Sequence, residues 1–248
     1  MNVSGKNCER ATGWAQLSFT VRISNYQVSR FSNAGLLTWA CKLGHMTKSL
    51  ATIQPVVFAA GASSRMGDHK LLLELAGEPM VRRSVNQLLK AGFSSVMVVL
   101  GREPHRVKAA LEGLPCEFAL NEHYLSGMES SFRAAIDSFS SEATAALFTL
   151  ADQVFLSSLE YQRSLDTFGL EVFQTEHPLI AASRFGEVIA PPHIFSSELF
   201  PILGLPGRGA KPLIQANLER VRFVDHAPEL LFDVDTPEDY AQAKTTLR

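Results

Sequence analysis

A segment of small residues that ends in two cations is the part of this sequence best suited to chemistry. It covers residues 59–70, Ala-Ala-Gly-Ala-Ser-Ser-Arg-Met-Gly-Asp-His-Lys, directly after an apolar stretch typical of a buried strand. Small residues let the backbone approach a ligand closely. Exposed backbone N–H groups can hold phosphate oxygens while cations neutralise them. The pattern therefore predicts a phosphate cradle, in which the backbone of Gly61–Ser64 contacts the oxygens and Arg65 and Lys70 supply charge.

This segment matches neither of two common phosphate-binding motifs. It lacks the Gly-Lys-Ser/Thr of a P-loop and the Gly-x-Gly-x-x-Gly of a dinucleotide-binding fold. The alternative to a cradle is an ordinary tight turn from strand to helix. Such a turn would require neither Arg65 nor Lys70, so the full pattern favours the cradle.

A second polar segment, residues 121–131, follows another predicted strand. Asn121 offers donors and acceptors to a base edge, and Gly127 permits close approach of a ligand. Ser130 and Ser131 lie where a helix starts and N–H groups point outward. The alternative is that one of these serines only caps the helix.

An aspartate at the end of a predicted strand is the first candidate metal ligand. Asp152 follows the apolar run 144–150. A carboxylate there is a hard oxygen ligand of the kind that Mg²⁺ binds together with substrate phosphates. The alternative is a helix cap, although residues 154–156 separate Asp152 from the next helix.

The C-terminal segment 232–240 supplies the second candidate ligand. Thr236 is predicted to cap the last helix, with Pro237 at its first position and Asp239 three residues after the cap. This leaves Asp235 as a candidate metal ligand. The alternative is that Asp233 and Asp235 are solvated or belong to the cap.

Alternating strands and helices position these groups. The predicted strands are 53–60, 95–100, 117–120, 144–150 and about 179–183, and the predicted helices are 79–91, 104–111, 130–139, 158–168 and the segment after Thr236. The strands are apolar throughout, which is typical of a sheet covered on both faces. We therefore expect an α/β fold with a single doubly wound, mostly parallel, Rossmann-like sheet. Ligands of such sheets bind beyond the carboxyl ends of the strands, where residues 61–70, Asn121 and Asp152 fall.

Composition restricts the class of protein. The net charge is −2, which gives no global basic field for nucleic acid. The three cysteines are far apart and match no zinc spacing, and their small odd number favours a reducing compartment. No apolar run approaches the roughly 20 residues of a membrane span. We expect a cytoplasmic protein that binds neither nucleic acid nor membrane.

The first 50 residues differ from the rest of the chain. They hold six Lys and Arg residues against one acid, and both tryptophans, with one possible short strand at Leu17–Ile23. Three interpretations remain open: a targeting peptide, a binding arm for an acidic partner, or sequence upstream of a true start at Met46. We favour the last and expect a poorly ordered or non-native extension at 1–50, followed by one domain at 51–248.

The four motifs, in this order, resemble the signature of the MobA-like nucleotidyltransferases of molybdenum cofactor biosynthesis. The resemblance implies Mg²⁺-dependent transfer of a nucleoside monophosphate from a triphosphate to a phosphorylated acceptor. It implies catalytic roles for Arg65, Lys70 and Asp152, and Mg²⁺ on Asp152 with Asp235 as the second candidate. The implied nucleotide-binding residues are Ala59, Ala60, Gly61, Ser63, Ser64, Arg65, Lys70, Asn121, Gly127, Met128, Ser130 and Ser131.

Departures from the family pattern lie mainly on the acceptor side. Val154 replaces the usual proline after Asp152, residues 207–211 lack an aspartate, and residues 186–193 replace a shorter Gly-x-Pro. We interpret His69 and His193 as polar surface residues, because neither belongs to a catalytic pattern.

The sequence leaves more than one candidate for the nucleotide and for the acceptor. Ala59-Ala60-Gly61 is more similar to the cytidylyltransferase branch, which transfers CMP from CTP to molybdopterin cofactor for xanthine dehydrogenase-type enzymes, so an apo-molybdoenzyme is a possible partner. Guanylyl transfer and sugar- or alditol-phosphate nucleotidyl transfer are the alternatives within this chemistry. A non-catalytic molybdopterin carrier is the alternative outside it.

Overall fold

The computed structural model describes residues 22–23, 26–27, 53–61, 69–172 and 180–247. The chain divides into two units, Met1–His45 and Met46–Arg248. In the first unit, β1 (Arg22–Ile23) pairs antiparallel with β2 (Tyr26–Gln27). The strand expected at Leu17–Ile23 lies outside the described residues except for its last two. None of the helices in the described ranges is long and apolar enough to cross a membrane.

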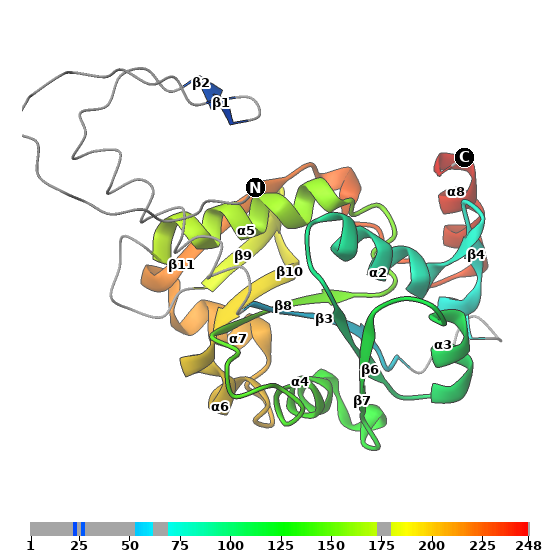
Figure 1. The fold of residues 1–248 in the computed structure, drawn as a ribbon, viewed down its shortest axis with the longest axis horizontal. Coiled ribbons are helices and arrows are strands. Elements are labelled where there is room, and N and C mark those ends of the chain that lie inside the picture. Colours follow the sequence, from blue (N-terminus) through cyan, green and yellow to red (C-terminus); the bar gives the residue numbers. More distant parts are fainter. Residues whose placement is uncertain (1–21, 24–25, 28–52, 62–68, 173–179, 248) are drawn as a thin grey trace, which may run out of the picture. The chain divides into compact units, whose positions relative to one another are not determined.

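The second unit contains a seven-stranded sheet with the order β11-β9-β10-β8-β3-β6-β7 (Figure 1). Its strands are β3 (Ile53–Ala59), β6 (Val96–Leu100), β7 (Cys116–Leu120), β8 (Ala145–Leu150), β9 (Ile180–Phe185), β10 (Val188–Ser196) and β11 (Val221–His226). Only β10 runs antiparallel to its neighbours, β8 and β9. β4 (Glu74–Leu75) and β5 (Glu78–Pro79) form a separate antiparallel hairpin, which follows β3 in the sequence. The expectation of a mostly parallel α/β sheet is confirmed.

Helices cover both faces of the sheet. The helices are α2 (Met80–Lys90), α3 (Pro104–Ala110), α4 (Met128–Ile136), α5 (Ser158–Val172), α6 (Phe200–Leu203), α7 (Ala210–Ala216) and α8 (Pro237–Thr246), and the 3₁₀ turns are η1 (Lys70–Leu72), η2 (Tyr124–Ser126), η3 (Ser197–Leu199), η4 (Leu218–Arg220) and η5 (Pro228–Leu230). One core cluster joins the sheet to α2, α3 and α5, and a second joins the opposite face to α4, α6 and α7. Alternate residues of β3 explain this division, since Val57 belongs to the first cluster and Val56 to the second.

The path of the chain changes direction between β3 and β8. From β3 the chain moves outward through α2 to β6 and through α3 to β7. It then returns through α4 to β8, on the other side of β3. The strand order therefore reverses at this point, and ligands of doubly wound sheets bind at the carboxyl ends of the strands where it does so.

The antiparallel strand β10 is an element that the sequence pattern did not reveal. It contains Pro191 and Pro192, and proline removes a ladder donor and so normally argues against an inner strand. The structure accommodates the pair at a register shift between Ile189 and His193. The helix expected at 130–139 instead begins at Met128, so Ser130 and Ser131 do not cap it.

The interpretation of His69 and His193 as surface residues is wrong. His69 has no exposed surface, and its Nε2 lies 3.1 Å from the carbonyl oxygen of Arg102. His193 is 3% exposed, opposite Phe148 in the sheet. Burial lowers the pKa of His193 from 6.5 to about 3, and the contact with the backbone of Pro192 offsets this only in part.

This buried imidazole predicts acid sensitivity. Between pH 6.5 and about 3 the unfolded chain binds a proton at His193 that the folded protein does not bind. Stability is therefore lost as the pH falls through this range, by about 2 to 3 kcal/mol at pH 4.5. Urea unfolding at pH 7 and pH 4.5 should show a smaller difference for His193→Gln than for the wild type. The same substitution at the exposed His105 is the control, and an equal difference in all three proteins would contradict the prediction.

Candidate functional site

Three segments converge at the carboxyl ends of β3 and β8. Lys70 opens η1 after the segment that follows β3, and Asp152 lies two residues beyond β8. An isolated bridge between Gln153 and Asp233 brings the C-terminal segment to the same place. The site thus forms at the reversal point of the sheet, from residues that are distant in sequence.

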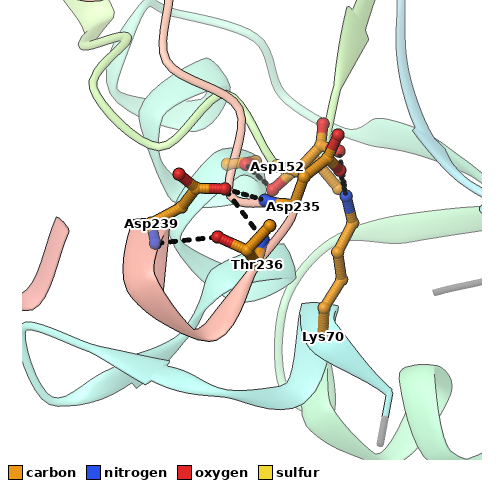
Figure 2. Close-up of polar contacts among 7 residues, drawn as sticks. Lys70, Asp152, Asp235, Thr236 and Asp239 are labelled. Atoms are coloured by element: carbon orange, nitrogen blue, oxygen red, sulfur yellow. Dashed lines mark hydrogen bonds and ion pairs between the residues drawn. The ribbon is translucent and has the colours of Figure 1, made fainter. Parts of the chain in front are cut away.

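Lys70 links the two predicted metal ligands. Its Nζ donates to Oδ2 of Asp152 at 2.6 Å and to Oδ1 of Asp235 at 2.7 Å. Figure 2 shows the lysine side chain extending toward the carboxylates of Asp152 and Asp235. The Lys70 and Asp152 side chains are 10% and 18% exposed, while that of Asp235 is 40% exposed. The structure thus brings together one predicted phosphate ligand and both predicted metal ligands.

Negative charge is concentrated at the site, in contact with the Lys70 ammonium. Burial alone would lower the pKa of Lys70, but Asp152 and then Asp235 raise it above its ordinary value. Partial burial, followed by the charges of Asp152 and Asp235, raises the pKa of Asp233 to about 6. A third carboxylate therefore lies within the field of this pair, and a further cation would be stabilised there.

A capping box holds Asp235 in place (Figure 2). The Thr236 hydroxyl accepts from the Asp239 backbone N–H at 3.1 Å, which confirms the predicted cap. In return, Oδ2 of Asp239 accepts from the backbone N–H groups of Thr236 at 2.8 Å and Asp235 at 3.1 Å. The start of α8 therefore fixes the backbone that carries the Asp235 carboxylate.

Thr236→Ala should destabilise the protein. Loss of an N-cap side chain costs about 1 kcal/mol. For a domain of this size we expect a fall in Tm of roughly 2 to 4 °C by differential scanning calorimetry. Thr245→Ala is the matched control on the same helix, because the Thr245 hydroxyl only donates to the Ala241 carbonyl within the helix. A Tm of Thr236→Ala equal to that of this control would contradict the prediction.

Asn121 lies at the end of β7, where it organises the following loop. Its Nδ2 donates to the hydroxyls of Ser130 at 2.8 Å and Ser131 at 3.0 Å, and its Oδ1 accepts from the His123 backbone N–H at 2.9 Å. Both amide hydrogens are thus used inside the protein, and Asn121 is only 3% exposed. The geometry places Asn121 as a positioning group for the two serines, and direct contact with a base stays a prediction.

A cavity of about 590 Å³ opens beside this loop. Its lining includes Asn121, Ser130, Arg133 and Gly207. Gly127 borders the loop with a φ of 117°, a conformation that favours glycine. Met128 is 48% exposed at the start of α4. The second predicted motif therefore frames a space large enough for part of a nucleotide or its acceptor.

Gly101 is a site residue that the sequence analysis missed. It directly follows β6, and a Cβ atom there would lie 2.7 Å from the carbonyl oxygen of Ala60 and 2.8 Å from Cβ of Tyr124. The missing side chain lets the start of the predicted cradle pack against the loop after β7. A glycine directly after a fully buried strand was the signal for this close approach.

The remaining predicted cradle residues are described only in part. Ala59 and Ala60 are buried at the end of β3, and Gly61 is exposed. Ser63, Ser64 and Arg65 lie outside the described residues. Their contact with phosphate therefore stays a prediction.

Comparison with known proteins identifies the family. Residues 55–222 match the MobA-like NTP transferase domain. The chain belongs to this family. It is therefore a nucleotidyltransferase, and the predicted family and enzyme class are confirmed.

Proteins similar to this chain carry different names. One, from Natronomonas pharaonis, is named "Probable molybdenum cofactor guanylyltransferase" and is 30% identical over 203 residues, 77% of this chain and 96% of the relative. The purine catabolism protein PucB of Bacillus subtilis is 30% identical over 204 residues, with the same two shares covered. The crystal structure of Rv0371c from Mycobacterium tuberculosis superposes with a TM-score of 0.68 at 25% identity, covering 78% of this chain and 98% of that one.

The donor set of the site fits a divalent cation. Among the described residues no group of three or more His, Cys, Asp or Glu side chains is arranged to hold a metal ion. Asp152 and Asp235 nevertheless place two carboxylate oxygens within 2.7 Å of one ammonium nitrogen. Mg²⁺ typically takes one or two protein carboxylates and completes its shell with water and substrate phosphates. The pair is therefore suited to a cation that arrives with a nucleotide.

Proposed function

We propose that this enzyme transfers CMP from CTP to molybdopterin cofactor in a magnesium-dependent reaction. The observation that carries the proposal is the meeting of Lys70, Asp152 and Asp235 beyond β3 and β8, next to the segment predicted to cradle a triphosphate. We also propose that the transferase domain spans 51–248, with residues 1–50 as an extension.

The reaction requires little covalent work from the protein. An oxygen of the acceptor phosphate attacks the α-phosphorus of CTP, the bond from that phosphorus to the β-phosphate oxygen breaks, and pyrophosphate leaves with the electron pair. The attacking phosphate is already anionic, so no general base is needed. Catalysis then rests on positioning and on charge neutralisation.

Residues of this chain supply both the positioning and the charge neutralisation. Arg65 and Lys70 neutralise the triphosphate, and the backbone of Gly61–Ser64 binds its oxygens. Asn121 orients Ser130 and Ser131, of which Ser130 lines the cavity that would receive the base or the acceptor. A Mg²⁺ ion held by Asp152 and Asp235 would offset the charge that develops on the α-phosphoryl group.

The choice of CTP rests on Ala59-Ala60-Gly61, which is similar to the cytidylyltransferase branch. Xanthine is a purine, so a relative named for purine catabolism supports a link to xanthine dehydrogenase-type enzymes. A relative named as a guanylyltransferase at the same identity makes GTP the competing nucleotide.

Thermal unfolding and pyrophosphate release together test the proposal. The full chain is unfolded with ATP, GTP, CTP or UTP, with and without Mg²⁺. A ligand at 100 times its Kd stabilises by about 2.7 kcal/mol, which is roughly 5 to 10 °C here. A Mg²⁺-dependent shift with CTP, and pyrophosphate release from CTP when molybdopterin is added, are expected.

Other outcomes would replace the proposal. A shift and turnover with GTP alone would make the enzyme a guanylyltransferase. Turnover only with a sugar or alditol phosphate would move the acceptor. Binding of molybdopterin without pyrophosphate release from any nucleotide would indicate a carrier.

A further inference from the structure

We propose that Lys70 is a built-in counter-ion that occupies the divalent-cation position between Asp152 and Asp235 until a triphosphate withdraws it. The inference rests on the proposed function, because it assumes that these carboxylates hold the cation that accompanies the nucleotide. It predicts that cation binding and nucleotide binding are coupled through one side chain.

The geometry is that of a cation between two ligands. One nitrogen lies 2.6 Å from an Asp152 oxygen and 2.7 Å from an Asp235 oxygen. The two partners are 82 and 165 residues away in sequence, so the contact belongs to the assembled site rather than to a local turn. An exposed ion pair of flexible side chains would be weak, but Lys70 is 10% exposed and is held by two carboxylates at once.

The geometry concentrates negative charge at this point, because oxygens of two carboxylates lie within 2.7 Å of the same nitrogen. Lys70 supplies one positive charge, whereas a divalent ion supplies two. An Mg²⁺ ion binds carboxylate oxygens at about 2.1 Å, so it would need the space that the Lys70 ammonium fills. The two cations are therefore competitors.

A triphosphate removes the competition. Lysine is a compact charge on a flexible four-carbon stem, so it can exchange its partners without movement of the backbone. Phosphate oxygens offer Lys70 new anionic partners, and the oxygens of Asp152 and Asp235 that Lys70 leaves then take the divalent ion. By thermodynamic linkage, each ligand strengthens the binding of the other to the same extent.

The proposal is tested by titrating the full chain with Mn²⁺ alone. Electron paramagnetic resonance measures the concentration of the free ion at each step. Without nucleotide, Lys70→Gln should bind Mn²⁺ about 10- to 100-fold more tightly than the wild type, because one to two charge-assisted contacts no longer compete. Lys70→Arg keeps the charge and should show no such gain. Lys90→Gln, at the exposed end of α2, is the control for loss of a positive charge elsewhere.

Equal or weaker Mn²⁺ binding by Lys70→Gln would overturn the counter-ion role, as would the absence of binding in every variant. Asp152→Asn should abolish the tight binding when combined with Lys70→Gln. Because this arm contains no nucleotide, it is independent of which nucleotide is used. Unchanged Mn²⁺ affinity with normal pyrophosphate release from the wild type would remove the inference and leave the proposed function intact.

A second measurement avoids the variants and keeps the test valid if Lys70→Gln fails to fold. Lysine side chains of the wild type are reductively methylated, and the modified peptides are quantified by mass spectrometry. Saturating Mg²⁺ without nucleotide should raise the labelling of Lys70 several-fold and leave that of Lys90 unchanged. Labelling of Lys70 that does not respond to Mg²⁺ would contradict the exchange.

Discussion

Asp152→Asn should lower kcat/KM for pyrophosphate release about 1000-fold while the protein stays folded, the loss typical when a preorganised electrostatic group is removed. The carboxylate is 18% exposed, contacts the Lys70 ammonium directly and is a proposed ligand of the cation. Asparagine has nearly the same shape as aspartate. Its amide carries no charge, however, so the attraction of this side chain for a cation is lost.

A matched aspartate separates this effect from a general loss of charge. Asp225 pairs with Arg184 at 2.7 Å on the edge strand β11, and its side chain is 69% exposed. Asp225→Asn should therefore change turnover by less than about twofold, since exposed ion pairs contribute little. Steady-state kinetics, with Tm recorded for each variant, checks both. An Asp152→Asn enzyme within tenfold of the wild type would rule out the assigned role of this carboxylate.

Phe148→Ala should cost about 3 to 5 kcal/mol of the free energy of unfolding, as large-to-small changes of buried aromatic residues do. Phe148 lies on β8, between β10 and β3 in the sheet, and is 1% exposed. Its ring contacts Phe58 at 5.6 Å in a stacked arrangement and Phe132 at 4.8 Å edge to face. Phe139 and Phe195 lie 6.3 and 6.2 Å away, so alanine would leave a cavity among four rings.

Phe118→Ala is the control with the same chemical change. Phe118 lies on the edge strand β7 and is 38% exposed, with the Lys108 ammonium 5.2 Å from its ring centre. We expect its loss to cost no more than about 1 kcal/mol. Urea unfolding followed by circular dichroism gives both values. Equal costs at the two positions would mean that the aromatic cluster does not support β8 and, through it, Asp152.

Local patterns in the sequence were sufficient for much of the fold. Apolar runs with helices between them predicted β3, β6 and β8 to within one residue, because these strands are buried on both faces. The bounds of β7 were also predicted to within one residue, although this edge strand has exposed residues. The cap of α8 was also predictable, since Thr236, Pro237 and Asp239 interact within one turn.

Other features could not be predicted from the sequence, because they depend on contacts between segments that are distant in the chain. β10 carries two prolines and is held by its neighbours on both sides, so only the assembled sheet makes it a strand. Burial of His193 has the same origin, because it follows from the position of β10 beside β8. The role of Gly101 depends on Ala60 and Tyr124, which come from two other segments.

The sequence by itself determined the candidate residues for the chemistry and that Lys70, Asn121 and Asp152 follow predicted strands. It assigned Lys70 to phosphate and Asp152 and Asp235 to a metal as separate roles. Only the tertiary structure decided that one ammonium group bridges the two carboxylates. The physical reason is that strand and cap signals act over a few residues, whereas a contact across 165 residues depends on the order of the strands in the sheet.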